Sequence, residues 1–248
     1  MIHEAPLPSA PGFPDVRFVA LAPTRVLAVD GTGMPEPTRP SPAGPEADSQ
    51  HDPQADFQAA IRTLYPIAYT IHFALKRRGV HAPVSAIEAL WDIAPGTTPL
   101  AVTWTALMSM PPEASDDEIS AAIEDVWRKK APPAIDRVAL VRFDEGLCAE
   151  IVHVGPYDAE TPTIERLHAA IAAAGCTMRG RHHEIYVSDP RRTAASTLRT
   201  IIRQPVDDAE RPRAPPLAWH PPDGPISHPP GQPTAPLARA GGAQEGST

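Results

Sequence analysis

The sequence predicts an α+β fold built from two related units. Short apolar runs with the two-residue period of strands alternate with stretches that have the three-to-four-residue period of amphipathic helices. The order of strand, helix and further strands occurs twice, with an extra helix between the two sets. Because the halves share no convincing sequence identity, the repeat rests on this pattern alone.

Proline is unusually frequent, with 33 residues in a chain of 248, and it is concentrated at both ends and in one internal stretch. Segments of this composition bury too little apolar surface to offset the entropy of ordering. We therefore expect a disordered N-terminal arm over 1–14, a folded domain over 15–207 with a flexible insertion at 34–53, and a disordered proline-rich tail over 208–248.

The first half begins with a strand that starts near Phe18 and is clearest over the apolar run Thr24–Asp30. Apolar residues then recur every three or four positions from Phe57 to Leu75, which predicts a helix with one face in the core. Pro66 lies within this pattern and should kink the helix or split it in two, because proline lacks a backbone donor. Extended segments follow at Pro83–Trp91 and Leu100–Met110.

The middle of the chain returns from helix to strand. Ser115 and Glu118 have the spacing of a capping box, which predicts the start of a second helix. Strands are expected over Arg137–Phe143 and Leu147–Val154. The residues between them, Asp144–Gly146, are a candidate hairpin turn.

The last part of the domain contains a helix, a strand and a second short helix. Thr161 is a plausible N-cap with a proline directly after it. The segment His183–Ser188 alternates as a strand does, and we expect a short helix over Ala194–Arg203. Glu184 therefore faces away from the neighbouring apolar layer of its strand.

Charge and motifs exclude several classes of protein. The net charge is −8 and no long basic run occurs, which argues against nucleic-acid and lipid-surface binding. The first residues lack the pattern of a signal peptide, and no apolar run is long enough to cross a bilayer. Two cysteines argue against a disulfide framework, so we expect a cytoplasmic protein. No phosphate-binding or nucleophile motif occurs, and we expect no cofactor.

Three phrases of the sequence carry a resemblance to a known family. They are FQAAIRTLYPIAYTIHFALK at Phe57–Lys76, FDEGLCAEIVHVGPY at Phe143–Tyr157 and HHEIYVSDPRR at His182–Arg192. Over roughly residues 16–207 the chain resembles the stand-alone GyrI-like small-molecule-binding domains. The resemblance implies two strand–helix–strand–strand modules related by a pseudo-twofold axis. Together they would form a curved antiparallel sheet with helices on one side and a ligand cleft between the halves.

The resemblance also implies a function and a site. This group includes hydrolases that open cyclopropane rings of DNA-alkylating compounds, so detoxification of planar aromatic or amphipathic xenobiotics is expected. Glu184 and Glu160 would activate water. Aromatic residues would bind the ligand, namely Tyr65, Tyr69, Trp91, Trp104 and Tyr186. We expect a small aromatic or cationic ligand as partner, and a monomer or weak homodimer.

Each of these residues also has a purely structural interpretation. Glu184 can be a solvated strand carboxylate, and Glu160 a first-turn acid that complements a helix dipole. The aromatic residues can be ordinary core. His182 and His183 point to opposite faces of a strand and so do not make a metal site by themselves.

Three functions remain open at the level of sequence. The first is a hydrolase for electrophilic toxins, and the second is a non-catalytic module that sequesters or senses drugs. Both would use the same residues, so only turnover of a cyclopropane-containing compound separates them. The third is an inhibitor that acts through protein–protein contact.

Overall fold

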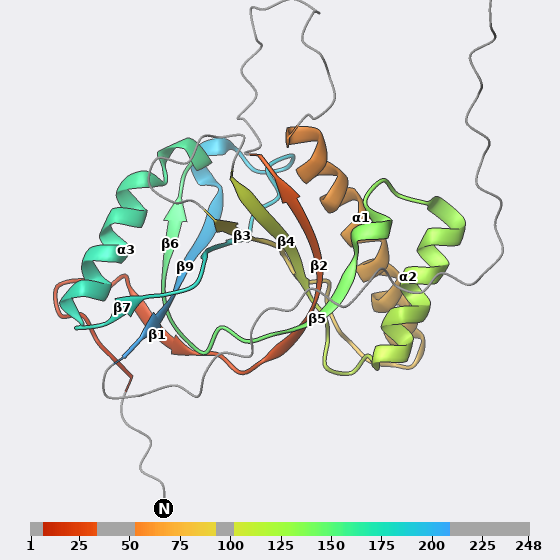
Figure 1. Cartoon of the computed structure of the whole chain (residues 1–248), viewed down its shortest axis with the longest axis horizontal. Coiled ribbons are helices and arrows are strands. Elements are labelled where there is room, and N and C mark those ends of the chain that lie inside the picture. The colour runs from red at the N-terminus through yellow and green to blue at the C-terminus, as the bar shows by residue number, and fades with distance from the viewer. Residues whose placement is uncertain (1–6, 34–52, 93–101, 209–248) are drawn as a thin grey trace, which may run out of the picture.

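The computed structural model describes residues 7–33, 53–92 and 102–208, and shows a large, strongly curved antiparallel sheet with its helices on the outside (Figure 1). The expected insertion at 34–53, apart from its last residue, and the expected tail after residue 208 lie outside these ranges. The helices are α1 (Pro53–Arg77), α2 (Asp116–Lys130) and α3 (Thr161–Ala173), with single 3₁₀ turns η2 (Ile135–Arg137), η3 (Tyr157–Ala159) and η4 (Ala195–Thr197). The strands are β1 (Arg17–Ala20), β2 (Thr24–Thr32), β3 (Ile87–Asp92), β4 (Thr103–Ser109), β5 (Ala139–Phe143), β6 (Leu147–Val154), β7 (Thr177–Met178), β8 (His182–Tyr186) and β9 (Arg199–Asp207).

The α+β fold with two strand–helix–strand–strand modules is confirmed. One module is β2–α1–β3–β4 and the other is β6–α3–β8–β9. The strand order is β1-β6-β9-β8-β3-β4-β2-β5, so the modules join where β8 pairs with β3. At this seam His183 lies opposite Leu90 and Glu184 lies opposite Ala89.

The hairpin predicted at Asp144–Gly146 is wrong. Strand β5 pairs with β2 and β6 pairs with β1, so the two strands lie at opposite ends of the sheet. The chain from β1 to β2 and the chain from β5 to β6 instead run side by side as one two-stranded ribbon, which crosses from one module to the other (Figure 1). The turn-like composition of Asp144–Gly146 marks the bend of this ribbon, where Leu21 N–H donates to the Gly146 carbonyl at 2.8 Å.

The first module has its core between α1, α2 and the sheet. The apolar stripe of α1 is buried as predicted, with Leu64, Ile71 and Leu75 at most 2% exposed. Helix α1 is not split at Pro66 but runs through it. Helix α2 begins with the predicted capping box, in which Ser115 Oγ accepts from Glu118 N–H and Glu118 accepts from Ser115 N–H.

The second module has a smaller core beneath α3, formed mainly by β1, β6 and β9. Residues before β1 belong to it, because Ala10 and Phe13 pack against this cluster. The Arg166 guanidinium lies 5.0 Å from the centre of the Phe13 ring, and it also forms a bidentate ion pair with Asp15. The arm expected over 1–14 therefore does not extend to residue 14 as a loose segment.

The helix expected over Ala194–Arg203 is also wrong. One 3₁₀ turn is followed by β9, which lies in the sheet between β6 and β8. The β-branched residues Thr200, Ile201 and Ile202 fit a strand that is hydrogen-bonded on both sides. Tertiary pairing thus overrode the helical tendency of the alanines that precede them.

Candidate functional site

Strand β8 presents its side chains to two different environments. Tyr186 packs against the core cluster of α1, and Glu184 and His182 share its face because strand residues alternate. Helix α1 packs on β2 and β4, and α3 packs on β6 and β7, so β8 and β3 lie between the two helices (Figure 1). The predicted site residue Glu184 is therefore placed at the seam of the two modules.

Glu184 is held in position by its own strand. Tyr186 Oη donates to Glu184 Oε2 at 2.7 Å, and His182 Nε2 lies 3.2 Å from Glu184 Oε1. The Glu184 side chain is 14% exposed. The interpretation of Glu184 as a freely solvated carboxylate does not fit these contacts.

Glu160 is the second predicted carboxyl group, and it is buried at 5% exposure. It occupies the N-cap position of α3, which had been expected at Thr161, but its side chain makes no capping hydrogen bond. Among the described residues Glu160 Oε1 has no hydrogen-bond partner. Burial, and then the charge of Glu184, raise the pKa of Glu160 to about 8. Glu160 is thus a carboxylic acid that keeps its proton at neutral pH beside Glu184.

Two residues that were not predicted as site residues complete the surroundings of Glu160. The Tyr157 ring packs edge-on against Tyr186 with centroids 5.5 Å apart. Burial and the carboxyl groups of Glu160 and Glu184 raise the pKa of Tyr157. The Thr200 hydroxyl lies beside Glu160 from β9. Tyr157 ends the family phrase FDEGLCAEIVHVGPY, and this position was the sequence signal that could have identified it as a site residue. No such signal in the sequence marked Thr200.

The turn that carries Tyr157 and Glu160 is fixed by a buried histidine. His153 Nδ1 lies 2.9 Å from Thr163 Oγ1, and His153 Nε2 lies 3.2 Å from the Pro156 carbonyl. These contacts connect β6 to η3 and to the first turn of α3. His153 thereby positions the turn on which Glu160 stands.

Tyr65 and Tyr69 begin an aromatic row along α1. Tyr69 stacks on Tyr65 at 6.3 Å and on Phe73 at 6.2 Å between ring centroids. Tyr69 is 48% exposed, and Phe73, which the sequence analysis did not select, is 50% exposed. Burial and the Asp189 carboxylate raise the pKa of Tyr65, which places the row next to the loop that follows β8. An exposed aromatic row therefore borders the seam.

The two tryptophans are buried more deeply than the predicted stacking role suggests. Trp91 is opposite His182 in the sheet, and its indole lies against the Tyr186 hydroxyl. Trp104 is 1% exposed, packs edge-on against Phe57 at 5.0 Å, and covers Gly31, where a Cβ atom would overlap the indole. Trp91 therefore borders the carboxyl pair, whereas Trp104 is placed in the core of the first module.

Metal ligands do not gather in the part of the chain that the structure describes. Over these ranges no group of three or more histidine, cysteine or acidic side chains is arranged to hold a metal ion. His183 faces away from His182, into the opposite side of the sheet, where it contacts Glu145 at 2.8 Å. Among the described helices none is both long and apolar enough to cross a membrane.

Comparisons with known proteins give one family model and several similar structures. The model of the GyrI-like small molecule binding domain matches residues 14–207. An uncharacterized conserved protein from Listeria innocua has a similar structure, with a TM-score of 0.65 and 28% identity over 78% of this chain and 92% of that one. A hydrolase from Listeria innocua has a TM-score of 0.63 and 27% identity over 81% of this chain and 93% of that one. A comparison with curated proteins gives no match.

Proposed function

The chain belongs to the GyrI-like small molecule binding domain family, and from that premise we propose that it hydrolyses strained, electrophilic, planar aromatic compounds at the seam between its two modules. The observation that carries the proposal is the pair Glu160 and Glu184. Glu160 is a buried acid with a pKa raised to about 8, and Glu184 is the carboxylate beside it. Such a pair holds one proton at neutral pH and can supply a general acid and a general base together.

The reaction we propose is the opening of a cyclopropane ring that is conjugated to a carbonyl group. Glu184 takes a proton from water, and the water oxygen forms a bond to a ring carbon. One ring C–C bond breaks, its electron pair moves to the conjugated carbonyl oxygen, and that oxygen takes the proton of Glu160. The product is the substrate plus one water. A proton passing from Glu184 back to Glu160 restores the starting state.

The surroundings of the pair support this division of labour. The Tyr186 hydroxyl and His182 occupy the two oxygens of Glu184 and so orient the base. The Tyr157 ring packs on Tyr186 from η3, near both carboxyl groups. Glu160 is buried, and exclusion of water strengthens electrostatic interactions with developing charge. The Listeria neighbour that is a hydrolase is 27% identical over most of its length, which supports the reaction class but names no substrate.

The body of the ligand would lie against the aromatic row of α1. Tyr69 and Phe73 are each about half exposed and stack in one line with Tyr65. Partly exposed aromatic rings in a row favour an aromatic ligand, because aromatic pairs gain about 0.5–1.5 kcal/mol beyond their buried area. This arrangement supports planar aromatic compounds as substrates rather than flexible aliphatic ones.

The test combines affinity and turnover for one planar aromatic compound that carries a carbonyl-conjugated cyclopropane. Tryptophan fluorescence reports binding, and mass spectrometry reports the product with one added water. We expect Glu184→Gln to bind the neutral compound nearly as well as wild type but to react at least about 10²-fold more slowly, because an amide does not accept the proton of water. Glu160→Gln should be slowed less. Tyr69→Ala should weaken binding without removing turnover at saturation.

Glu165→Gln is the matched control, because Glu165 is an exposed residue of α3 close to Glu160 in the chain. It should behave as wild type in both measurements. Turnover by Glu184→Gln at the wild-type rate would show that the assigned base is wrong.

The second candidate function is a non-catalytic module that binds or senses drugs. The same buried carboxyl pair and exposed aromatic row favour it, because a carboxylate and aromatic faces together attract organic cations. Wild-type protein that binds the test compound and releases no product would establish this function in place of the hydrolase.

A further inference from the structure

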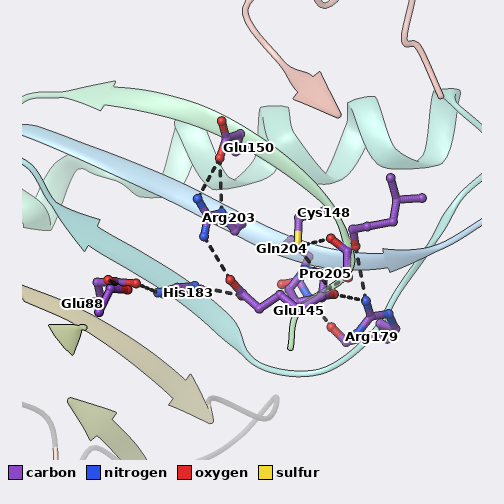
Figure 2. A network of polar contacts seen from close by, with 12 residues as sticks. Glu88, Glu145, Cys148, Glu150, Arg179, His183, Arg203, Gln204 and Pro205 are labelled. Atoms are coloured by element: carbon purple, nitrogen blue, oxygen red, sulfur yellow. Dashed lines mark hydrogen bonds and ion pairs between the residues drawn. The ribbon is translucent and has the colours of Figure 1, made fainter. Parts of the chain in front are cut away.

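On the face of β8 opposite to Glu184, His183 meets charged side chains from other segments of the chain, and the proposed function does not use this set (Figure 2). His183 is fully buried between two carboxylates, with Nδ1 2.8 Å from Glu145 Oε1 and Nε2 3.1 Å from Glu88 Oε2. Arg203 Nη1 donates to Glu145 Oε2 at 3.0 Å, and Arg203 Nη2 donates to Glu150 at 3.1 Å. We call Glu88, His183, Glu145, Arg203 and Glu150 the inner network.

A pocket of about 290 Å³ lies against this network. Part of its wall comes from the ribbon that joins the modules, and the rest comes from the central strands β3, β4, β8 and β9. The lining residues are Leu21, Ala22, Thr24, Phe143 and Glu145 from the ribbon, and Glu88, Ser109, Ile185 and Arg203 from the central strands. This volume is at the lower end of the range of small-molecule sites, which is about 300–1,000 Å³.

The two carboxylates in the wall retain capacity to accept hydrogen bonds. Glu88 Oε1 accepts from Ser109 Oγ at 2.9 Å, and each oxygen of Glu145 has one partner in the inner network. A carboxylate oxygen accepts about two hydrogen bonds, so acceptor positions remain on both residues. The Arg203 guanidinium, by contrast, is already bound to Glu145 and Glu150.

The wall therefore favours a ligand that donates hydrogen bonds. Two carboxylates and one guanidinium line the pocket, and the guanidinium already faces two carboxylates. Leu21, Phe143 and Ile185 add apolar surface on the same wall. A small molecule with a cationic, hydrogen-bond-donating head and an apolar or aromatic body matches this combination, because each part meets its complement.

We propose that this inner pocket is a second ligand site, separate from the Glu160–Glu184 pair, and that it binds small organic cations such as aryl amidines and aralkyl amines. The cationic head lies against Glu88 and Glu145, and the apolar body lies against Phe143, Ile185 and Leu21. Because Glu184 and Ile185 are neighbours on β8, one strand separates the two sites.

The test uses the full chain and benzamidine, with neutral benzamide as its near-isosteric partner, and measures affinity by calorimetry. We expect benzamidine to bind wild type more tightly than benzamide. Glu88→Gln should lower the affinity for benzamidine by about tenfold or more, because the hydrogen bond to a charged acceptor is lost. The affinity for benzamide should change little. Equal affinity of the two compounds for wild type would overturn the proposal.

A second variant leaves the inner network intact. Ala22 is an exposed wall residue on the ribbon, so Ala22→Trp should fill the pocket and abolish benzamidine binding without breaking a buried ion pair. Ala20→Trp, two residues away and outside the pocket wall, is the matched control and should bind as wild type does. Unchanged benzamidine affinity in Ala22→Trp would overturn the proposal.

Two measurements distinguish the two sites: one uses Glu184→Gln, and the other uses the planar cyclopropane compound proposed as substrate. Benzamidine affinity should be the same in Glu184→Gln as in wild type, and saturating planar compound should not displace benzamidine. If either the Glu184→Gln substitution or the planar compound lowers the affinity for benzamidine about tenfold, the cation binds at the seam and the inner site is rejected. The hydrolase proposal is not affected by that result.

Discussion

At the scale of single residues, Glu160 has the most unusual environment in the site. It stands at the start of α3, where a carboxylate normally complements the helix dipole, yet it makes no capping hydrogen bond. It is buried beside Glu184, Tyr157, Tyr186 and Thr200 instead, and desolvation disfavours its charged form. A side chain that weakens the fold in this way at neutral pH is better explained by chemistry than by stability.

The cost of Glu160 should appear in the pH dependence of stability. Its pKa is raised from 4.5 to about 8 in the folded protein, so between these values the unfolded chain loses the proton that the folded chain keeps. The free energy of unfolding of wild type should therefore fall as pH rises from about 5 to 8, relative to Glu160→Gln, which stays neutral. Above about pH 8 the difference should level off.

Urea denaturation at pH 5, 6, 7 and 8 measures this difference. Glu165→Gln, which changes an exposed acid of the same helix, should follow wild type at every pH. A difference between wild type and Glu160→Gln that is constant over this range would mean that Glu160 is ionised in the folded protein.

At the scale of elements, the segment before β1 is part of the second module. Phe13 packs on the core beneath α3, and Arg166 holds both the Phe13 ring and the Asp15 carboxylate. Composition alone assigned this segment to a loose arm, because proline dominates it and a single phenylalanine makes no periodic pattern. The contact with α3 is long-range and leaves no local signal in the sequence.

Removal of the Phe13 ring should therefore destabilise the protein. We expect Phe13→Ala to cost about 1–2 kcal/mol, less than a fully buried aromatic residue, since Phe13 is only partly buried. This corresponds to a decrease of a few degrees in the thermal midpoint for a domain of this size. Leu7→Ala, an exposed residue of the same segment, is the control and should leave the midpoint unchanged. An unchanged thermal midpoint in Phe13→Ala would show that residues 7–14 are a dispensable arm, as the composition had predicted.

At the scale of the whole molecule, the inner network ties the ribbon to the seam between the modules. Glu145 lies in the bend between β5 and β6, and its partners His183 and Arg203 lie on β8 and β9. Arg179 also donates to the Glu145 backbone carbonyl. Glu145 is thus the residue through which the ribbon is fixed to the central strands.

Loss of the Glu145 charge should destabilise the whole fold, with a defined pH dependence. Burial opposes ionisation of Glu145, but the hydrogen bonds and charges of His183 and Arg203 lower its pKa overall. The contribution of the Glu145 charge to the free energy of unfolding is therefore present at pH values above the ordinary pKa of 4.5. It is lost as the pH falls through the lowered pKa. We expect Glu145→Gln to cost about 3–5 kcal/mol near pH 6, because charged partners remain buried.

Urea denaturation of wild type and Glu145→Gln from pH 7 to pH 3 tests this expectation. The difference in free energy of unfolding between wild type and Glu145→Gln should become smaller as the solution becomes acidic. Glu124→Gln, an exposed acid of α2, is the control and should show no gap. A gap that persists unchanged at pH 3 would mean that shape rather than charge at position 145 supports the ribbon.

The sequence by itself determined the class of fold and most of the elements, and it indicated the strand of the candidate site. Periodicity placed the stripe of α1, the capping box of α2 and the alternation of β8, because these features depend on neighbours only a few residues apart. The family resemblance singled out Glu160, Glu184 and Tyr186, which the structure brings together. Which strands pair, by contrast, depends on contacts far apart in the chain. Only the tertiary structure therefore separated β5 from β6, turned the expected last helix into β9, placed Trp104 in the core and assembled the inner network from four separate segments.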